Sequence, residues 1–328
     1  MTPRASRAVP LALASALFFT LTYVLNRRAA VTGGHWAWTA SLRYLLTLPM
    51  IAVAVGSRRG GIRPVLTAMR ERPAPWLLWS GVGFVLFYVC MAWAAASGPS
   101  WLVAAGFQLT VVAGMLLAPL LYEDDRRRVP PRALAVGLVI VAGVVVMQLG
   151  HFGGGLDAGA WLALGAVTVS AFTYPLGNRR MLLHLEHERR TLDSLQRVFG
   201  MTLASIPLWL VVAAYAWWSA GPPPVEQIAL AAGVALSAGV IATVLFFEAT
   251  ARVQGDPVAL GAVEAMQGSE LLFSTIMGVI LLGEPWPTGW TLAGAAVVIL
   301  GLVGFAAVGR GERRSALAPI RASEPRDE

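Results

Sequence analysis

The sequence predicts an all-α integral membrane protein with ten transmembrane helices, arranged as two inverted five-helix repeats. Three observations predict this fold. Apolar residues make up 57% of the 328-residue chain and charged residues only 13%, against about 25% in an ordinary soluble domain. The apolar residues gather in stretches of about 20, the length that crosses the hydrocarbon core of a bilayer. The two halves of the chain also repeat a series of short motifs in the same order.

The composition excludes several classes of function. All 25 basic residues are arginine, because the chain contains no lysine. A Walker A loop needs its lysine on the phosphates, and a retinal or pyridoxal Schiff base needs a lysine as well, so we expect no such ATPase and no cofactor. The net charge of +7 does not indicate nucleic acid, because the arginines lie in short clusters between apolar stretches, as in membrane loops. The single cysteine, Cys90, excludes an intrachain disulfide.

Ten apolar stretches are expected to span the membrane. They cover residues 8–25, 36–55, 76–96, 101–121, 132–150, 159–177, 196–218, 227–248, 257–282 and 287–308. Arg4 and Arg7 precede the first stretch, as in a signal peptide. Its apolar part is longer than that of a signal peptide and more spans follow, so we expect an uncleaved first helix.

The distribution of arginine predicts the orientation. If the N-terminus is cytoplasmic, 21 arginines fall in cytoplasmic segments and only Arg27 and Arg28 fall in outer loops. Positive residues favour the cytoplasmic side. We therefore expect both termini to be cytoplasmic, in a bacterial-type inner (plasma) membrane. Residues 1–7 would form the cytoplasmic N-terminus, and the polar residues 309–328 a disordered cytoplasmic tail.

The internal repeat is visible as six pairs of matching motifs. The pairs are Thr22–Arg28 with Thr173–Arg180, Leu42-Arg43 with Gln196-Arg197, Val85–Tyr88 with Val244–Phe247, Gly98-Pro99 with Asp256-Pro257, Gln108 with Gln267, and Tyr122–Asp124 with Gly283–Pro285. Residues 8–150 are thus expected to form the first repeat and residues 159–308 the second. A unit of five helices is odd, so the second copy must enter the membrane inverted. Inverted repeats are typical of secondary transporters.

The ten-span layout, the repeat and Gly283-Glu284-Pro285 at the close of the ninth span resemble the drug/metabolite transporter superfamily in its EamA-like form. Two stretches resemble its branch called the multidrug resistance efflux transporter (EmrE-like) family. They are residues 26–44, with Asn26-Arg27, Trp36, Trp38 and Ser41–Tyr44, and residues 264–273, with Glu264-Ala265 and Gln267–Phe273. The resemblance covers residues 8 to about 308 and implies transport of small molecules by alternating access.

One departure from that family concerns the coupling residue. The related small multidrug resistance proteins, which are dimers of four-helix chains, use a glutamate in their first helix. This chain has no acidic residue in its first span. A coupling acid, if there is one, must therefore lie elsewhere.

The few acidic residues within spans are informative, because a charge at the bilayer centre costs about 2.5–3.5 kcal/mol even on the lenient insertion scale. The ninth span holds Glu264, Gln267 and Glu270, and steps of three residues place them on one stripe of a helix. Glu270 lies near mid-span, where a carboxyl group can exchange a proton near neutral pH or pair with a cationic substrate. Competition between the two would give antiport. The alternative is a structural ion pair or hydrogen bond inside the bundle.

Other polar and aromatic residues complete the expected site. Arg43 lies about two turns into the second span, and Arg197 lies nearer the start of the seventh. Each can extend toward the lipid headgroups, pair with Glu270 or bind an anionic substrate group. Asn26 and Asn178 are expected to cap helix ends. The residues expected to line the pocket are Tyr23, Trp38, Gln108 and Phe273.

The sequence therefore predicts a secondary active transporter, with proton-coupled efflux of small amphipathic or cationic compounds as the first hypothesis. A metabolite carrier for amino acids or other small polar metabolites is the second, and a non-transporting scaffold or receptor the third. The expected partners are a small-molecule substrate, protons and the lipid bilayer, for a monomer or a homodimer. The histidines lie at or outside helix ends without metal-ligand spacing, so we expect neither a metal site nor an enzyme.

Overall fold

The computed structural model describes residues 3–58, 60–96, 98–129, 131–151, 158–253 and 266–304, and all regular structure in these ranges is helical. Seven helical segments within them are long and apolar enough to cross a membrane. These are Ala8–Val31, Trp36–Gly56, Pro73–Ala94, Ser100–Leu121, Pro131–Leu149, Ser194–Ala220 and Val225–Arg252. The expectation of a multi-pass helical membrane protein is therefore confirmed.

The first half of the chain contains the N-terminal helices. They are α1 (Pro3–Val31), α2 (Trp36–Gly56), α3 (Arg63–Glu71), α4 (Pro73–Ser80), the π-helical η1 (Gly81–Leu86), α5 (Phe87–Ala94), α6 (Ser100–Phe107), α7 (Leu109–Leu121), the 3-10 turn η2 (Asp125–Arg127) and α8 (Pro131–His151). Here α4, η1 and α5 together form the third apolar segment, and α6 and α7 form the fourth.

The second half begins with α9. Its helices are α9 (Ala158–His187), α10 (Ser194–Ala220), α11 (Val225–Val234), the π-helical η3 (Ala235–Ala242), α12 (Thr243–Arg252), α14 (Ser269–Leu282) and a helix over Gly289–Gly304. The last two are apolar but too short to count among the seven candidate spans. The helix α9 is long, but its C-terminal part carries the polar run from Asn178 to His187.

Two helices extend well beyond their predicted ends, because arginine-rich segments that were expected to be loops continue them. The first span was expected to end at residue 25, yet α1 continues to Val31. The sixth was expected to end at residue 177, yet α9 continues to His187. Asn26 and Asn178 consequently lie inside helices, and the prediction that they cap helix ends is wrong. The extensions carry the charged side chains that pair at the two ends of the bundle.

Two kinds of interruption divide the long helical segments. The segment Pro73–Ala94 contains η1 in its middle, and the segment Val225–Arg252 contains η3 in its middle. A tight turn at Gln108 separates α6 from α7, with its amide donating to Ala105 O at 3.1 Å. A similar turn precedes α14, where the Glu270 amide donates to Gln267 O at 3.0 Å. Such π and 3-10 interruptions often mark functional sites.

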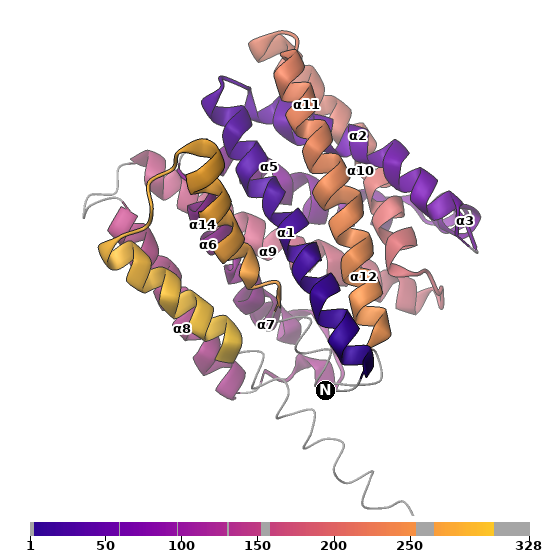
Figure 1. Cartoon of the computed structure of the whole chain (residues 1–328). Coiled ribbons are helices and arrows are strands. Elements are labelled where there is room, and N and C mark those ends of the chain that lie inside the picture. Colours follow the sequence, from indigo (N-terminus) through magenta and orange to yellow (C-terminus); the bar gives the residue numbers. More distant parts are fainter. Residues whose placement is uncertain are drawn as a thin grey trace, which may run out of the picture.

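The helices pack around α1 and α9 (Figure 1). The helix α1 contacts α11, η3 and α12 on one side and α14 and α6 on another, while α9 contacts α4, η1 and α5 as well as α6 and α7. The helices α2 and α10 also pack extensively against each other. Gly83 in η1 and Gly177 in α9 permit a close approach of their helices, since a Cβ atom at Gly177 would lie 2.4 Å from the Gly83 backbone.

The helix α8 and the helix Gly289–Gly304 lie side by side at one edge of the bundle (Figure 1). A Cβ atom at Gly143 would lie 2.8 Å from Val298 N, and one at Gly294 would lie 2.4 Å from Met147 N. Glycines on both helices therefore allow backbone contact, as small residues do in membrane bundles.

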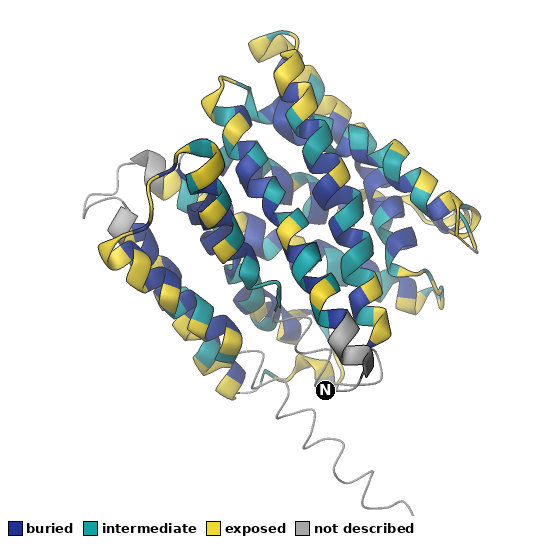
Figure 2. Ribbon diagram, viewed as in Figure 1, coloured by how far each residue is buried: buried dark blue, intermediate teal, exposed yellow. Residues whose placement is uncertain are grey.

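Buried residues lie mainly on the helix faces inside the bundle, and exposed residues lie mainly on its outer faces and ends (Figure 2). Large side chains such as Trp76, Tyr88 and Trp209 are fully buried in the interior. Large apolar side chains are exposed on outward faces, for example Leu120 (75%) and Ile280 (73%). A surface of this kind suits a lipid environment, in which apolar side chains need no further cover.

Candidate functional site

Glu270 lies in the first turn of α14, directly after the turn at Gln267 and Gly268. Its side chain is buried, and its Oε2 accepts a hydrogen bond from Tyr23 Oη of α1 at 3.1 Å. Thr20 Oγ1 of α1 lies 3.5 Å from the Glu270 carbonyl oxygen. The carboxyl group thus lies at the contact between the first and the ninth spans, inside the bundle. A hydrogen bond to a charged group is stronger than one between neutral groups.

Arg43 lies in α2 among aromatic rings. Its guanidinium carbon is 3.9 Å from the centre of the Tyr88 ring and 5.1 Å from that of Tyr44. The Tyr44 ring stacks on Trp209 of α10 with ring centres 4.6 Å apart. A cation over an aromatic ring is stabilised by about 0.5–2 kcal/mol. Arg43 forms no ion pair with Glu270 within the described residues, so the two groups stay separate.

Tyr23 connects these two parts of the site. It lies within electrostatic range of Glu270, Arg43 and Tyr174. Tyr174 of α9 keeps 38% of its surface exposed although its ring lies against Phe87, with 5.0 Å between ring centres. The site therefore draws its side chains from α1, α2, α9 and α14, and part of its surface is accessible.

Several buried polar atoms of the site have no hydrogen-bond partner among the described residues. They are Arg43 Nη1, Asn26 Nδ2 and Gln267 Nε2. Buried polar groups are nearly always paired, so each exception calls for a reason.

The other predicted site residues lie in different places. Gln108 is buried at the break between α6 and α7, and its Nε2 lies 3.4 Å from Ala104 O. Phe273 is partly buried one turn after Glu270. Trp38 lies away from Glu270, at the end of the bundle where α10 finishes, and donates from Nε1 to Gly221 O at 2.8 Å. Glu264 lies outside the described residues. Of the expected stripe the structure describes Gln267 and Glu270, and a turn lies between them.

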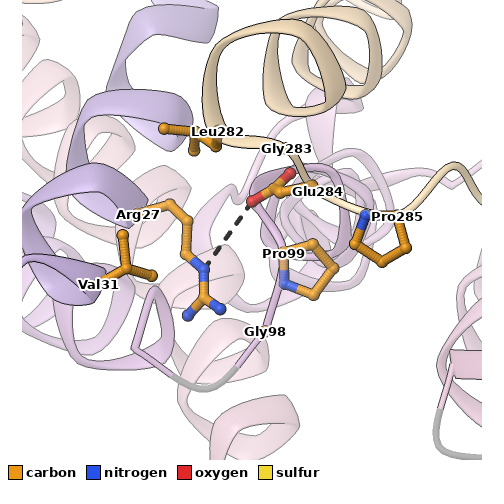
Figure 3. Close-up of a pocket in the computed structure, with 8 residues that line it drawn as sticks. All are labelled: Arg27, Val31, Gly98, Pro99, Leu282, Gly283, Glu284 and Pro285. Carbon is orange, nitrogen blue, oxygen red and sulfur yellow. Dashed lines mark ion pairs between the residues drawn. The ribbon is translucent and has the colours of Figure 1, made fainter.

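A separate pocket of about 320 Å³ opens at the end of the bundle where α1 finishes (Figure 3). Glu284 is buried there, and its two carboxylate oxygens accept hydrogen bonds from Ser100 N and Ser100 Oγ, both at 2.7 Å. Ser100 is the first residue of α6, whose free amide groups favour an anion. Arg27 Nε lies 3.8 Å from Glu284 Oε1 and its Nη1 donates to the carbonyl oxygens of Ala95 and Ala96.

Ion pairs also close the opposite end of the bundle, where α9 finishes. Arg126 donates to both oxygens of Glu186 at 3.1 Å and to Asp124. These bonds hold the pKa of the Asp124 carboxyl below its ordinary value. The pairs that connect the α3–α4 region to the end of α9 are Arg72 with Glu188, at 3.8 Å, and Arg190 with Glu71.

Sequence reasoning missed Tyr88 and Tyr174 as members of the site. Tyr88 is fully buried and donates from its hydroxyl to Asn26 Oδ1 at 3.0 Å. Both tyrosines stand inside motifs used to detect the repeat, Val85–Tyr88 and Thr173–Arg180, so that signal was available but did not assign them to a site.

Comparisons with known proteins were made for the whole chain. Residues 6–310 match the family described as "EmrE: Putative multidrug resistance efflux transporter". The chain is 41% identical over 306 residues to "Uncharacterized protein YjlA" of Bacillus subtilis (strain 168), covering 90% of this chain and 93% of that protein. It is 39% identical over 284 residues to "Uncharacterized 42.1 kDa protein in intracellular alkaline protease 3'region" of Shouchella clausii, covering 85% and 74%.

One solved structure, described as "Crystal structure of protein", is similar with a TM-score of 0.59. The sequence identity is 17%, and the match covers 93% of this chain and 98% of the other. At this identity the likeness concerns the fold alone.

Proposed function

Because the chain belongs to the EmrE family of multidrug resistance efflux transporters, in the drug/metabolite transporter superfamily, we propose that it is a secondary active carrier that exports small amphipathic or cationic compounds in exchange for protons. Transport of small molecules is what the family implies. The proton, the efflux direction and the substrate class are the parts that we propose. The location would be the inner membrane of a bacterial-type cell, with both termini cytoplasmic, and the carrier would work as a monomer or a homodimer.

The buried carboxyl group of Glu270 carries this proposal. Its single side-chain hydrogen bond within the described residues comes from Tyr23, and no ion pair neutralises it there. A carboxylate at this depth costs free energy unless it is protonated or paired. Proton binding and cation binding therefore compete for one group. This competition couples the two fluxes, because release of the proton favours binding of the substrate, and release of the substrate favours binding of the proton.

The packing pattern supports two inverted repeats and alternating access. Under this proposal α1 corresponds to α9, and the third segment, with η1, corresponds to the eighth, with η3. The contacts of α1 with α12 and α14 then correspond to those of α9 with α5 and α7. Both proposed repeats also interrupt a helix at a glutamine, Gln108 or Gln267. Broken helices at the interface of inverted repeats are typical of binding sites in secondary transporters.

The ion pairs at the two ends are arranged consistently with such a carrier. The end of α1 pairs with the segment after α14, through Arg27 and Glu284, and with the start of α11, through Arg28 and Glu226 at 3.4 Å. The end of α9 pairs with the segment after α7, through Glu186 and Arg126. We propose that these contacts break and form in alternation when the central site opens to one side or the other.

A metabolite carrier is the second candidate, and Arg43 favours it. A cation exporter has no evident need for an arginine near the site, whereas a polar metabolite often carries an anionic group. The two candidates share the fold, the central site and the coupling group.

The test is flux into proteoliposomes. Full-length protein is reconstituted, a pH gradient is imposed, and the fluxes of a panel of amines, dyes and polar metabolites are measured for the wild-type protein and Glu270→Gln. We expect gradient-driven flux in the wild-type protein and its loss in the variant, with exchange of labelled substrate reduced less. Glu248→Gln is the matched control, because Glu248 is exposed and, among the described residues, pairs only with Arg252 of its own helix. Undiminished gradient-driven flux in Glu270→Gln would overturn the coupling assignment.

A further inference from the structure

We propose that the central site holds a second subsite, formed around Arg43, that binds an anionic group of the substrate, of the carboxylate type. The proposal rests on the proposed transport function and narrows its substrate class. It follows from the position of a guanidinium group that has no anionic partner among the described residues.

The electrostatic surroundings of Arg43 leave its charge incompletely compensated. The Tyr88 ring at 3.9 Å and the Tyr44 ring at 5.1 Å stabilise it, and the side chain of Tyr88 also interacts with it as a hydrogen-bond partner. A charge within the bilayer is costly, and a cation–π contact offsets only part of that cost. The remainder is unfavourable until an anion arrives.

Unused hydrogen-bond donors lie on both sides of Tyr88. Arg43 Nη1 is buried without an acceptor, and so is Asn26 Nδ2, whose Oδ1 already accepts from the Tyr88 hydroxyl. Donors outnumber acceptors at this place. A carboxylate supplies two acceptor oxygens and a negative charge, and arginine binds such groups with good geometry.

Glu270 does not provide that anion. Its Oε2 accepts from Tyr23, and no ion pair joins it to Arg43 in the part of the chain that the structure describes. Tyr23 and Tyr174 lie within electrostatic range of both groups. Glu270 and Arg43 therefore lie in one region without forming an ion pair with each other. A ligand with a charged group can pair with either of them.

The side chain of Arg43 is also accessible in part. It is half-buried although one of its nitrogens is fully buried. Tyr174 exposes 38% of its surface in the same region. Part of the Arg43 side chain is therefore left uncovered by the core residues Tyr88 and Trp209, which are fully buried.

The experiment measures binding with two matched sets of probes. One set is isopentylamine, 4-methylpentanoate and leucine, and the other is phenethylamine, 3-phenylpropionate and phenylalanine. Each set presents one hydrocarbon skeleton with an amine, a carboxylate or both. Binding to purified full-length protein is followed by the shift in thermal unfolding temperature over a concentration series. We expect at least one carboxylate-bearing probe to bind more tightly than the matched amine.

Arg43→Gln should weaken binding of that probe by about tenfold or more, since a charge-assisted bidentate contact is lost. Arg43→Lys should restore only part of it, because lysine keeps the charge but lacks the planar fork. Arg180→Gln is the matched control. Arg180 also lies over an aromatic ring, 5.5 Å from the centre of Trp79, and also has a buried nitrogen without a partner. We expect the control to bind the probe as the wild-type protein does.

The unliganded proteins give a second readout. Removal of an uncompensated charge should leave the unfolding temperature of Arg43→Gln equal to or above that of the wild-type protein. A lower unfolding temperature with unchanged probe binding would assign Arg43 a structural role and overturn the proposal. So would a result in which no carboxylate-bearing probe binds. Persistent proton-driven flux in Glu270→Gln would refute the coupling assignment alone, so the two failures can be told apart.

Discussion

The hydrogen bond between Tyr23 and Glu270 is the contact on which the proposed coupling depends. The two residues are 247 positions apart in the sequence. Position within a span and residue type single out each of them in the sequence. Neither property indicates that the two side chains contact each other. The pairing follows from the packing of α1 against α14, which single-sequence patterns do not encode.

Replacing Tyr23 by phenylalanine tests that contact. The variant keeps the ring and removes the donor to Glu270 Oε2, and a hydrogen bond to a charged group contributes about 1.5–3 kcal/mol. We expect gradient-driven transport to fall by roughly tenfold or more, and the unfolding temperature to fall as well, since the same buried hydrogen bond stabilises the fold. The flux assay in proteoliposomes measures the first and a thermal melt in detergent the second. The control is Tyr215→Phe, since Tyr215 is 45% exposed and contacts only His35 and Trp36 among the described rings. Equal loss in both variants would contradict the role of Tyr23.

Glu284 gives a second prediction at the residue scale. Its carboxylate satisfies Ser100 N and Ser100 Oγ, so Glu284→Ala leaves buried donors without an acceptor. The expected loss of stability is about 1–3 kcal/mol, visible as a lower unfolding temperature. Glu226→Ala removes an exposed pair with Arg28 instead, and exposed pairs contribute only about 0–1 kcal/mol. An unchanged melt of Glu284→Ala would mean that Glu284 does not hold α6 and α14 together.

At the scale of the elements, hydropathy located the spans well because lipid selects long apolar stretches. The interruptions were not predicted. The sequences of η1 and η3 contain neither a proline nor a charged residue that would signal a π turn. The turns at Gln108 and Gln267 coincide with matched glutamines that the sequence comparison of the halves had paired. The match indicates that the two positions correspond in the two halves. A glutamine does not by itself predict a turn of the backbone.

The contact between α8 and the helix Gly289–Gly304 gives a prediction for these elements. A Cβ atom at Gly294 would lie 2.4 Å from Met147 N, so Gly294→Ala must separate the two helices, and overpacking costs about 1–3 kcal/mol. Gly165→Ala is the control, because no atom lies within 4 Å of a Cβ there. It should be neutral or stabilising by up to about 1 kcal/mol, since alanine favours a helix over glycine. Thermal melts of the two variants should therefore shift in opposite directions. A stabilised Gly294→Ala would refute the close helix contact.

At the scale of the whole molecule, the arginine distribution predicts which end faces the cytoplasm. In a Cys90→Ser background, single cysteines are placed at Thr32 and Glu188, which lie at opposite ends of the bundle. We expect a membrane-impermeant maleimide to label the Thr32 position in intact cells and the Glu188 position only after lysis, because positive loops stay inside. The reverse pattern would show that the orientation is inverted.

Membrane character and helical class followed from composition, because few charges and many apolar residues leave no other stable arrangement in lipid. The site was predicted only in part. Glu270, Arg43 and Tyr23 were found because ionisable and aromatic groups within spans are rare enough to stand out. Tyr88 and Asn26 were missed as partners, since their contact depends on how α1 and α5 are placed. Trp38 was chosen for its aromatic character and lies at the end of the bundle, bonded to Gly221.

The central claim is that a proton and a substrate compete for Glu270. Proton release on substrate binding tests it most directly. A transported compound is mixed with the purified protein in weakly buffered detergent solution, and the pH change is recorded at several starting pH values. We expect the wild-type protein to release protons, Glu270→Gln to release none, and Glu248→Gln to release as many as the wild-type protein. Equal release by the wild-type protein and Glu270→Gln would contradict it.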